Sequence, residues 1–205
     1  MKESTITILI ILGFLFLSVM KTISWMNSTY DKAIIYQEDV DKSLGDVVTQ
    51  NQISVDLISK LVNNVKGYVA HEQETLIGVI EARAKATSTT LNSGNLNAEN
   101  IQSFQEAQSG LSSALSKLML VVEQYPVLKA NQNFSELQAQ LEDAENRISV
   151  SKMKYNESVN IYNFHIRGKF RKWALNIIGE DDEFPKKEMF EAVSENAEVR
   201  PKVEF

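Results

Sequence analysis

The sequence predicts an all-α protein, in which an N-terminal transmembrane helix is followed by an antiparallel, up-and-down bundle of long helices and a flexible acidic C-terminal tail. Three observations predict this class. The 17 residues from Ser4 to Met20 carry no charge. Through most of the remaining chain, apolar residues recur three, four and seven positions apart, which is the period of an amphipathic helix. No segment keeps the apolar–polar alternation of a half-buried strand.

The uncharged run is expected to cross a membrane. At about 1.5 Å per residue it covers about 26 Å, and flanking residues extend it to the roughly 30 Å of a bilayer core. Lys2 and Lys21 can reach the two surfaces, and Trp25 stands where an interfacial anchor is expected. A cleaved signal peptide is the alternative, but no small-x-small pair follows the apolar core. We therefore expect an uncleaved anchor in residues 1–27, with residues 5–23 in lipid and an orientation that the few basic residues do not decide.

The rest of the 205-residue chain is long enough for one domain, which we place at residues 28–179. The net charge of −6 argues against a nucleic-acid partner, and the absence of cysteine excludes disulfides and thiolate chemistry. From Glu180 onward nine acidic residues stand against four basic ones. Residues 180–205 are therefore expected to form an extended, largely disordered tail.

The first helix after the anchor is predicted to run unbroken from about Tyr30 to Thr87. A third apolar row widens its stripe beyond a two-stranded coiled coil, so the helix needs partners inside a bundle. Gly67 and Gly78 are expected to be tolerated in the helix interior, and could mark close helix contacts or bends. Residues 48–76 could in principle belong to two helices, but no proline or turn cluster breaks the stretch. One apolar series recurs every seven residues: Val48, Val55, Val62, Val69 and Leu76.

Two further long helices are expected after a loop at residues 87–97. Asn97 can cap the first of them, and Tyr125-Pro126 ends it, because proline cannot continue the helical hydrogen bonds. Asn133 can cap the other. The first of the two has a regular stripe of Ile101, Phe104, Gln108, Leu111, Leu115, Leu118 and Val122.

The last long helix contains a seven-residue repeat, Tyr155-Asn156 and Tyr162-Asn163. The repeat places two tyrosines two turns apart on one face. They could line a small-molecule groove, although tyrosines at helical spacing are more often core residues with hydroxyls at the rim. Tyr155 and Tyr162 are therefore ligand or interaction candidates.

A short amphipathic element is expected from Phe170 to Gly179. Basic residues alternate here with aromatic ones in the run RGKFRKW, residues 167–173. Such a composition suits an interfacial helix on anionic lipid. It equally suits a cap that closes the bundle end. Strict up-and-down packing after one continuous first helix directs this element away from the bilayer, which favours the cap.

The segment Leu61–Ala86, LVNNVKGYVAHEQETLIGVIEARAKA, resembles the signature of the bacterial LemA family. The sequence departs from the family pattern at Ser59, where a proline is common, and at residues 165–173, which replace a proline-containing turn. The resemblance is supported by LSKLMLVVEQYPVLKANQN at residues 115–133, LQAQLEDAENRI at residues 137–148, the two Tyr-Asn pairs and the terminal PKVEF.

The LemA resemblance implies a small protein with one N-terminal membrane helix and an antiparallel helical bundle, with no assigned enzyme activity or cofactor. Some LemA-like proteins take part in membrane-organelle formation in magnetic bacteria, which suggests scaffolding. We accordingly expect a single-pass protein of the bacterial inner membrane.

A polar cluster around His71 is the first place to look for chemistry. His71 and Glu74 are one helical turn apart, a spacing that two metal ligands can have. Di-metal bundles need Glu-x-x-His motifs on two helices, and that set is missing, so no metal is predicted. Glu72 occupies a seam position otherwise held by apolar residues, where a carboxylate must be paired or reach solvent. Its candidate partners are His71, Lys154 and Arg147; a polar interruption that fixes helix register is the simpler interpretation.

No catalytic arrangement is recognisable, since the chain has no Gly-rich phosphate loop and its two histidines are far apart. We therefore predict no enzyme activity and no cofactor. The expected function is that of a membrane-anchored structural, scaffolding or interaction module with a protein partner or self-association. The alternative is a ligand or ion sensor that binds near His71 and Glu72.

Overall fold

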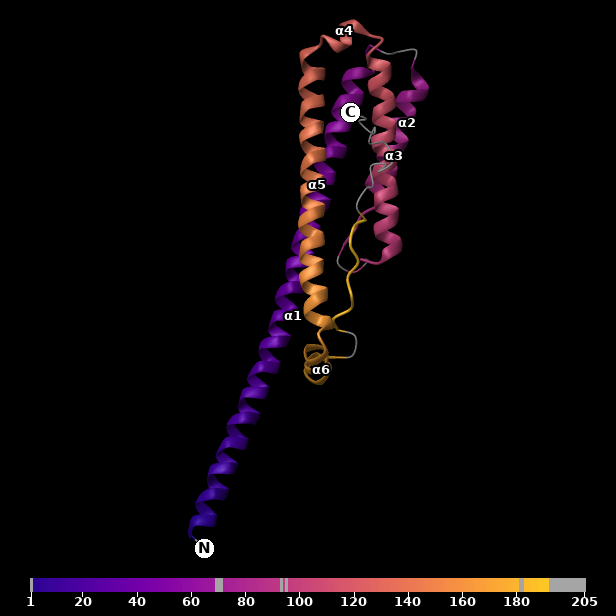
Figure 1. Ribbon diagram of the computed structural model, residues 1–205. Coiled ribbons are helices and arrows are strands. Elements are labelled where there is room, and N and C mark those ends of the chain that lie inside the picture. Colours follow the sequence, from indigo (N-terminus) through magenta and orange to yellow (C-terminus); the bar gives the residue numbers. More distant parts are fainter. Residues whose placement is uncertain (1, 69–71, 93, 95, 181–182, 192–205) are drawn as a thin grey trace, which may run out of the picture.

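The computed structural model describes residues 2–68, 72–92, 94, 96–180 and 183–191. Within these ranges the chain forms helices and no strand, which confirms the predicted all-α class. The long helices run alternately up and down, and α4 links α3 to α5 at the end farthest from the N-terminus (Figure 1). The helices are α1 (Lys2–Val65), α2 (Gln73–Ser88), α3 (Ala98–Val122), α4 (Pro126–Lys129), α5 (Gln132–Arg167) and α6 (Lys169–Ile178).

Helix α1 is continuous from the apolar N-terminal run into the bundle (Figure 1). Its 64 residues give a length of about 96 Å. Residues 6–25 are exposed on every side, and one face becomes buried from Met26 onward. Within the described residues, α1 is the helix that is long and apolar enough to cross a membrane, and none of its apolar window is buried. The N-terminal part therefore has the surface of a lipid-embedded helix.

The prediction of one helix from Tyr30 to Thr87 is wrong, because α1 ends at Val65. A turn follows, in which the Tyr68 amide donates to the Val65 carbonyl at 2.9 Å. Gly67 lies in this turn, where its low helix propensity of about 1 kcal/mol relative to alanine favours a break. The apolar repeat does not reveal the break, since α1 and α2 both bury their stripes in the same bundle.

The extra reversal changes where the later helices end. With α1 and α3 running away from the membrane span, α2 and α5 run back toward it (Figure 1). The end of α5 and all of α6 therefore lie at the membrane-proximal end of the bundle. The sequence argument that directed the fourth element away from the bilayer fails for this reason.

The helix caps agree closely with the sequence patterns. Asn97 caps α3, with its side chain accepting from the Asn100 amide at 2.8 Å. Helix α5 is capped two residues earlier than predicted, by Asn131 instead of Asn133. Gly179 follows the last residue of α6, as expected.

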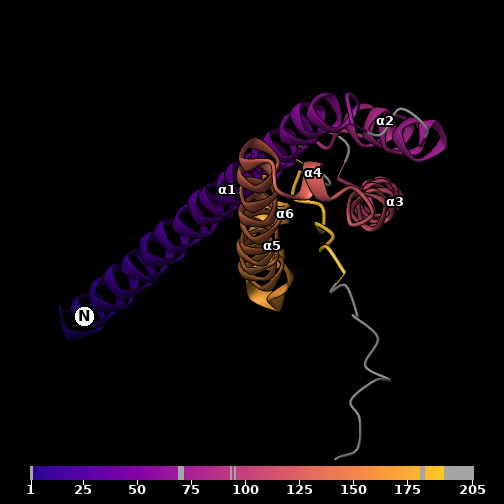
Figure 2. The ribbon, with the colours of Figure 1, turned by 90° about the horizontal axis from the view of Figure 1, so that it is seen from above.

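Two apolar clusters fill the bundle, one above the other. The membrane-distal cluster joins Val55–Val65 of α1 to α2, the second half of α3 and the start of α5. The membrane-proximal cluster joins residues 33–47 of α1 to the start of α3 and the second half of α5. Helix α1 packs mainly on α5, and α2 packs mainly on α3, so the bundle is built from two helix pairs (Figure 2).

Residues 183–191 form an extended segment, the strap, that lies along α5 (yellow in Figure 1). The predicted bundle boundary at residue 179 thus falls before a segment that is packed on the helices. The Asn163 amide group pairs with the Lys187 backbone in both directions, at 2.8 and 3.0 Å. The Asn156 amide group pairs in the same way with the Phe190 backbone, at 2.9 Å in each direction.

The Tyr-Asn repeat matches the strap because of two spacings. Seven helical residues rise about 10.5 Å, and three extended residues span about 10 Å. Each asparagine can therefore meet a strap residue three positions from the other. The tyrosine hydroxyls donate to strap carbonyls, Tyr155 to Glu188 at 2.9 Å and Tyr162 to Pro185 at 3.0 Å.

We expect Asn163→Ala to destabilise the folded protein by about 1–3 kcal/mol, since it leaves the buried Lys187 amide and carbonyl without their partner. Denaturant unfolding of the full chain in detergent measures this loss, and hydrogen exchange should increase at residues 185–190. Asn160→Ala is the matched control, because Asn160 is exposed on the same helix. Both substitutions replace asparagine with alanine and therefore raise the helix propensity by the same amount. Equal stability of the two variants contradicts the assigned role of the strap.

His165 joins the end of α5 to α1. It is buried, its Nε2 lies 2.9 Å from the Thr29 carbonyl oxygen, and its ring packs edge-on to Tyr36. Burial lowers the pKa of His165; the bond to Thr29 opposes this, and the charges of Arg171 and Lys32 add to the lowering. A histidine with a lowered pKa in the folded state stabilises the fold above the unfolded value of about 6.5, and this contribution is lost as the pH falls through that value.

The unfolding midpoint of the natural protein should therefore fall more steeply from pH 7.5 to pH 5 than that of His165→Gln. Thermal unfolding at a series of pH values checks this difference. The carboxylates are common to both proteins, so only the histidine separates their pH profiles. Parallel profiles would show that His165 does not carry the pH dependence.

Candidate functional site

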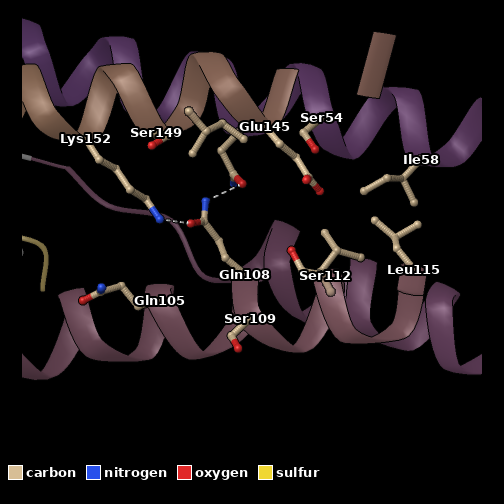
Figure 3. A pocket seen from close by; sticks show the side chains of 13 residues that line it. Ser54, Ile58, Gln105, Gln108, Ser109, Ser112, Leu115, Glu145, Ser149 and Lys152 are labelled. Atoms are coloured by element: carbon tan, nitrogen blue, oxygen red, sulfur yellow. Dashed lines mark hydrogen bonds between the residues drawn. The ribbon is translucent and has the colours of Figure 1, made fainter. Parts of the chain in front are cut away.

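A polar layer separates the two apolar clusters in the middle of the bundle. Asn51 of α1 and Ser151 of α5 are buried here. Gln108 of α3 bridges the other two helices, with Nε2 donating to Asn51 Oδ1 at 2.8 Å and Oε1 accepting from Lys152 Nζ (Figure 3). Because α3 and α5 belong to different helix pairs, this bridge ties the two halves of the bundle together.

Lys152 is the charged centre of this layer. Its ammonium group lies 5.5 Å from the Phe190 ring centroid and 6.0 Å from that of Phe104. Burial lowers the pKa of Lys152. The ion pairs among the described residues, Arg147–Asp143 and Lys186–Glu188, do not include it. Lys152 is therefore a half-buried cation held by an amide oxygen and two aromatic faces.

A cavity of about 300 Å³ adjoins the layer between α1, α3 and α5. Lys152 and Gln108 line one side of it, and Ile58 and Leu115 line the apolar end (Figure 3). Asn51 is also part of the lining. Hydroxyl groups line much of the remainder, on Ser54, Ser109, Ser112 and Ser149. The cavity thus offers one cation, the Glu145 carboxyl group, several neutral hydrogen-bonding groups and an apolar floor. Burial raises the pKa of Glu145, and the Glu142 carboxylate adds to this shift.

The predicted candidates do not meet in this cavity. His71 lies outside the described residues. Glu72 precedes the first residue of α2 without a side-chain cap bond, and Glu74 is exposed in the first turn of that helix. Glu72 is thus at a helix start and not in a mid-helix seam, as the unbroken-helix prediction had placed it. Arg147, one suggested partner of Glu72, instead pairs with Asp143 at 2.8 Å.

Tyr155 and Tyr162 are completely buried, and their hydroxyls are bound to the strap. Burial raises the pKa of Tyr162 to about 12 and raises the pKa of Tyr155 further, with the Asp41 carboxylate adding to both shifts. The interpretation of these tyrosines as core residues with hydroxyls at the rim agrees with this placement.

Sequence reasoning missed Lys152 as a site residue. Its signal was Gln108, the one polar member of the apolar stripe predicted for α3. A polar residue in such a stripe needs a partner across the bundle. Which residue supplies it depends on the register of α5 against α3, and the helical period does not fix that register.

Among the described residues, no three His, Asp or Glu side chains gather as a set of metal ligands. The polar layer joins Lys152, Gln108 and Asn51 beside a cavity lined by serine hydroxyls and Glu145. What it can do chemically is hold an anion or a polar group against Lys152.

Three curated relatives share a stretch of this chain. Magnetosome proteins MamQ 1 and MamQ 2 of Paramagnetospirillum magneticum strain AMB-1 are each 32% identical over 85 residues, which is 42% of this chain and 30% of each relative. Magnetosome protein MamQ of Magnetospirillum gryphiswaldense is 31% identical over 84 residues, which is 41% of this chain and 29% of the relative. The shared stretch therefore spans less than a third of these relatives. The profile of the LemA family matches residues 43–205. This match covers most of the chain, from the last third of α1 onward, and the chain belongs to the LemA family.

Proposed function

We propose that this membrane-associated helical protein is a non-catalytic scaffold of the bacterial inner membrane, which presents a rigid bundle to a protein partner or to another copy of itself. The continuity of α1 carries this proposal. A single helix that crosses the lipid and then forms one wall of the bundle leaves no flexible linker between the anchor and the domain. Such a connection holds the bundle surface at a defined distance from the bilayer.

An exposed apolar pair on α2 supports binding to a protein. Ile77 and Ile80 are about half exposed, at 52% and 45%, and lie one turn apart on the face next to the buried Leu76 and Val79. Exposed apolar residues on one face are the usual mark of a contact surface. The relatives are magnetosome proteins by name, which favours a role in organising a membrane.

A photo-crosslinking residue at Ile80 of the full chain in bacterial membranes should give an adduct of higher mass. The same residue at Glu142, on the exposed face of α5, is the control and should give less. Sizing in gentle detergent then separates a partner from self-association. A monomer with no adduct from either position would remove the support for a scaffold.

A second function is favoured by the cavity beside Lys152: binding of a small anionic ligand. The half-buried ammonium group forms no ion pair among the described residues, although Glu145 lines the same cavity, and a ligand carboxylate or phosphate could supply a partner. The sequence-based prediction of ligand sensing near His71 and Glu72 is a separate proposal, which concerns the membrane-distal end of α2.

The test is thermal unfolding of the full chain with inorganic phosphate, succinate and citrate. A ligand that binds the folded state raises the unfolding midpoint. At a concentration about a hundred times its dissociation constant, the ligand adds about 2.7 kcal/mol to the free energy of unfolding. Lys152→Met should abolish the rise, and Lys154→Met should retain it, because Lys154 is exposed two residues away. Unchanged midpoints, or equal rises in both variants, would count against this cavity as the site.

A further inference from the structure

Helix α6 lies where α1 leaves the membrane. Trp25 of α1 lines a shallow recess together with Gly168–Arg171 at the start of α6. Figure 1 shows α6 beneath the end of α5 and beside α1, and Figure 2 shows it under α5 when the bundle is viewed from above. Residue 23 is the expected end of the lipid-embedded stretch, and Trp25 is about 3 Å beyond it along the helix axis. The head-group layer is roughly 5–8 Å thick on each side of a bilayer, so α6 is at its level.

One face of α6 has no partner among the described residues. Phe170, Trp173 and Ile177 are 79%, 53% and 56% exposed, and their spacing of three and four places them on a single face. Ala174 and Leu175 are buried on the other side against the bundle. The helix is therefore held on one side and presents three large apolar side chains on the other.

Basic side chains predominate around this face, although Glu180 and Glu183 line a recess together with Arg167 and Lys172. No acidic residue occurs between Glu157 and Glu180, whereas Arg167, Lys169 and Lys172 are exposed. The described residues form no ion pair with these three side chains. An apolar face flanked by unpaired lysines is the composition of a helix that lies in the surface of an anionic bilayer.

Arg171 connects this face to α5. Its Nη2 donates to the Phe164 carbonyl at 3.1 Å, and its guanidinium lies 5.0 Å from the Phe164 ring centroid. Phe164 is itself 73% exposed, so it enlarges the apolar surface at the same end of the bundle. Arg171 thus holds α6 at a set angle to α5, and the rings of Phe164 and Phe170 stay exposed.

We propose that α6 is an interfacial helix, with Phe170, Trp173 and Ile177 inserted at the head-group boundary of an anionic bilayer and Lys169 and Lys172 on the lipid phosphates. This second membrane contact goes beyond the scaffold function and does not depend on any protein partner. It stops the bundle from rotating or tilting about α1, because a helix that spans the membrane and one that lies in its plane together fix the orientation.

The test uses full-length protein reconstituted in nanodiscs of phosphatidylcholine with about 30% phosphatidylglycerol, which gives the bilayer a negative surface potential. The chain has two tryptophans, so Trp25→Phe leaves Trp173 as the only emitter. Lipids brominated near the carbonyl end of the acyl chains should quench about half or more of its emission, as expected for a ring at the head-group boundary. Replacing both lysines in Lys169→Gln/Lys172→Gln should weaken this quenching, and the weakening should vanish in discs without the anionic lipid.

Two matched variants keep the result decisive. Trp173→Phe leaves Trp25 beside the span and should be quenched whether or not α6 touches lipid, which reports on the anchor alone. The second of these variants combines Trp25→Phe, Trp173→Phe and Val127→Trp. It places the emitter at the membrane-distal end, where it should not be quenched. Emission from Trp173 that matches this distal variant, while Trp25 is quenched, would overturn the interfacial helix and leave the anchor standing. The same outcome with Trp173 shielded from aqueous iodide would assign the face to a protein contact instead.

Discussion

The packing of α5 along α1 is the constraint on which the rest of the molecule depends. It is the most extensive helix–helix interface among the described residues, and α1 is also the helix that enters the membrane. From Met26 to Val65, one side of α1 must therefore pack against the bundle core. In the N-terminal part, every side of the helix must be apolar enough to contact lipid. The change from an exposed surface on all sides to a buried stripe on one side marks where the bundle begins on α1. Because no turn intervenes, the position and direction of the bundle follow from the position of the span.

The strap and the polar layer close the side of the bundle that the helices leave open. The helices form two pairs, α1 with α5 and α2 with α3, and side chains of α3 and α5 meet through Gln108 and Lys152. Below this bridge the strap continues the connection, since Phe190 packs on both Tyr155 and Phe104. Asparagine side chains are suited to this task, because one amide group can donate to and accept from the same backbone residue, as a neighbouring strand would. An acidic, proline-containing segment is thereby held on a helix without forming a sheet.

Several features could be predicted because they depend only on local chemistry. The membrane span follows from an uncharged apolar run, the class from a helical period, and the caps at Asn97 and Gly179 from short-range hydrogen bonding. The break after Val65 was missed for the opposite reason. Heptads continue through a hairpin whenever both arms face the same core, and Gly67 lowers helix stability too little to be decisive in sequence. That single missed turn reversed the expected direction of every later helix.

The candidate site shows the same division. Tyr155 and Tyr162 were recognised as a spaced pair. Their partner is the strap, a segment whose composition indicates disorder. The strap is ordered by contacts with residues about 20 to 35 positions away in sequence. Sequence by itself determined the class, the candidate membrane span, the family and the repeat of side chains on α5, because each depends on neighbouring residues. Only the tertiary structure decided that the strap pairs with that repeat, that Lys152 faces a cavity and that α6 lies beside the membrane span. These depend on the number of chain reversals and on the register between helices, and both are set by packing across the whole bundle.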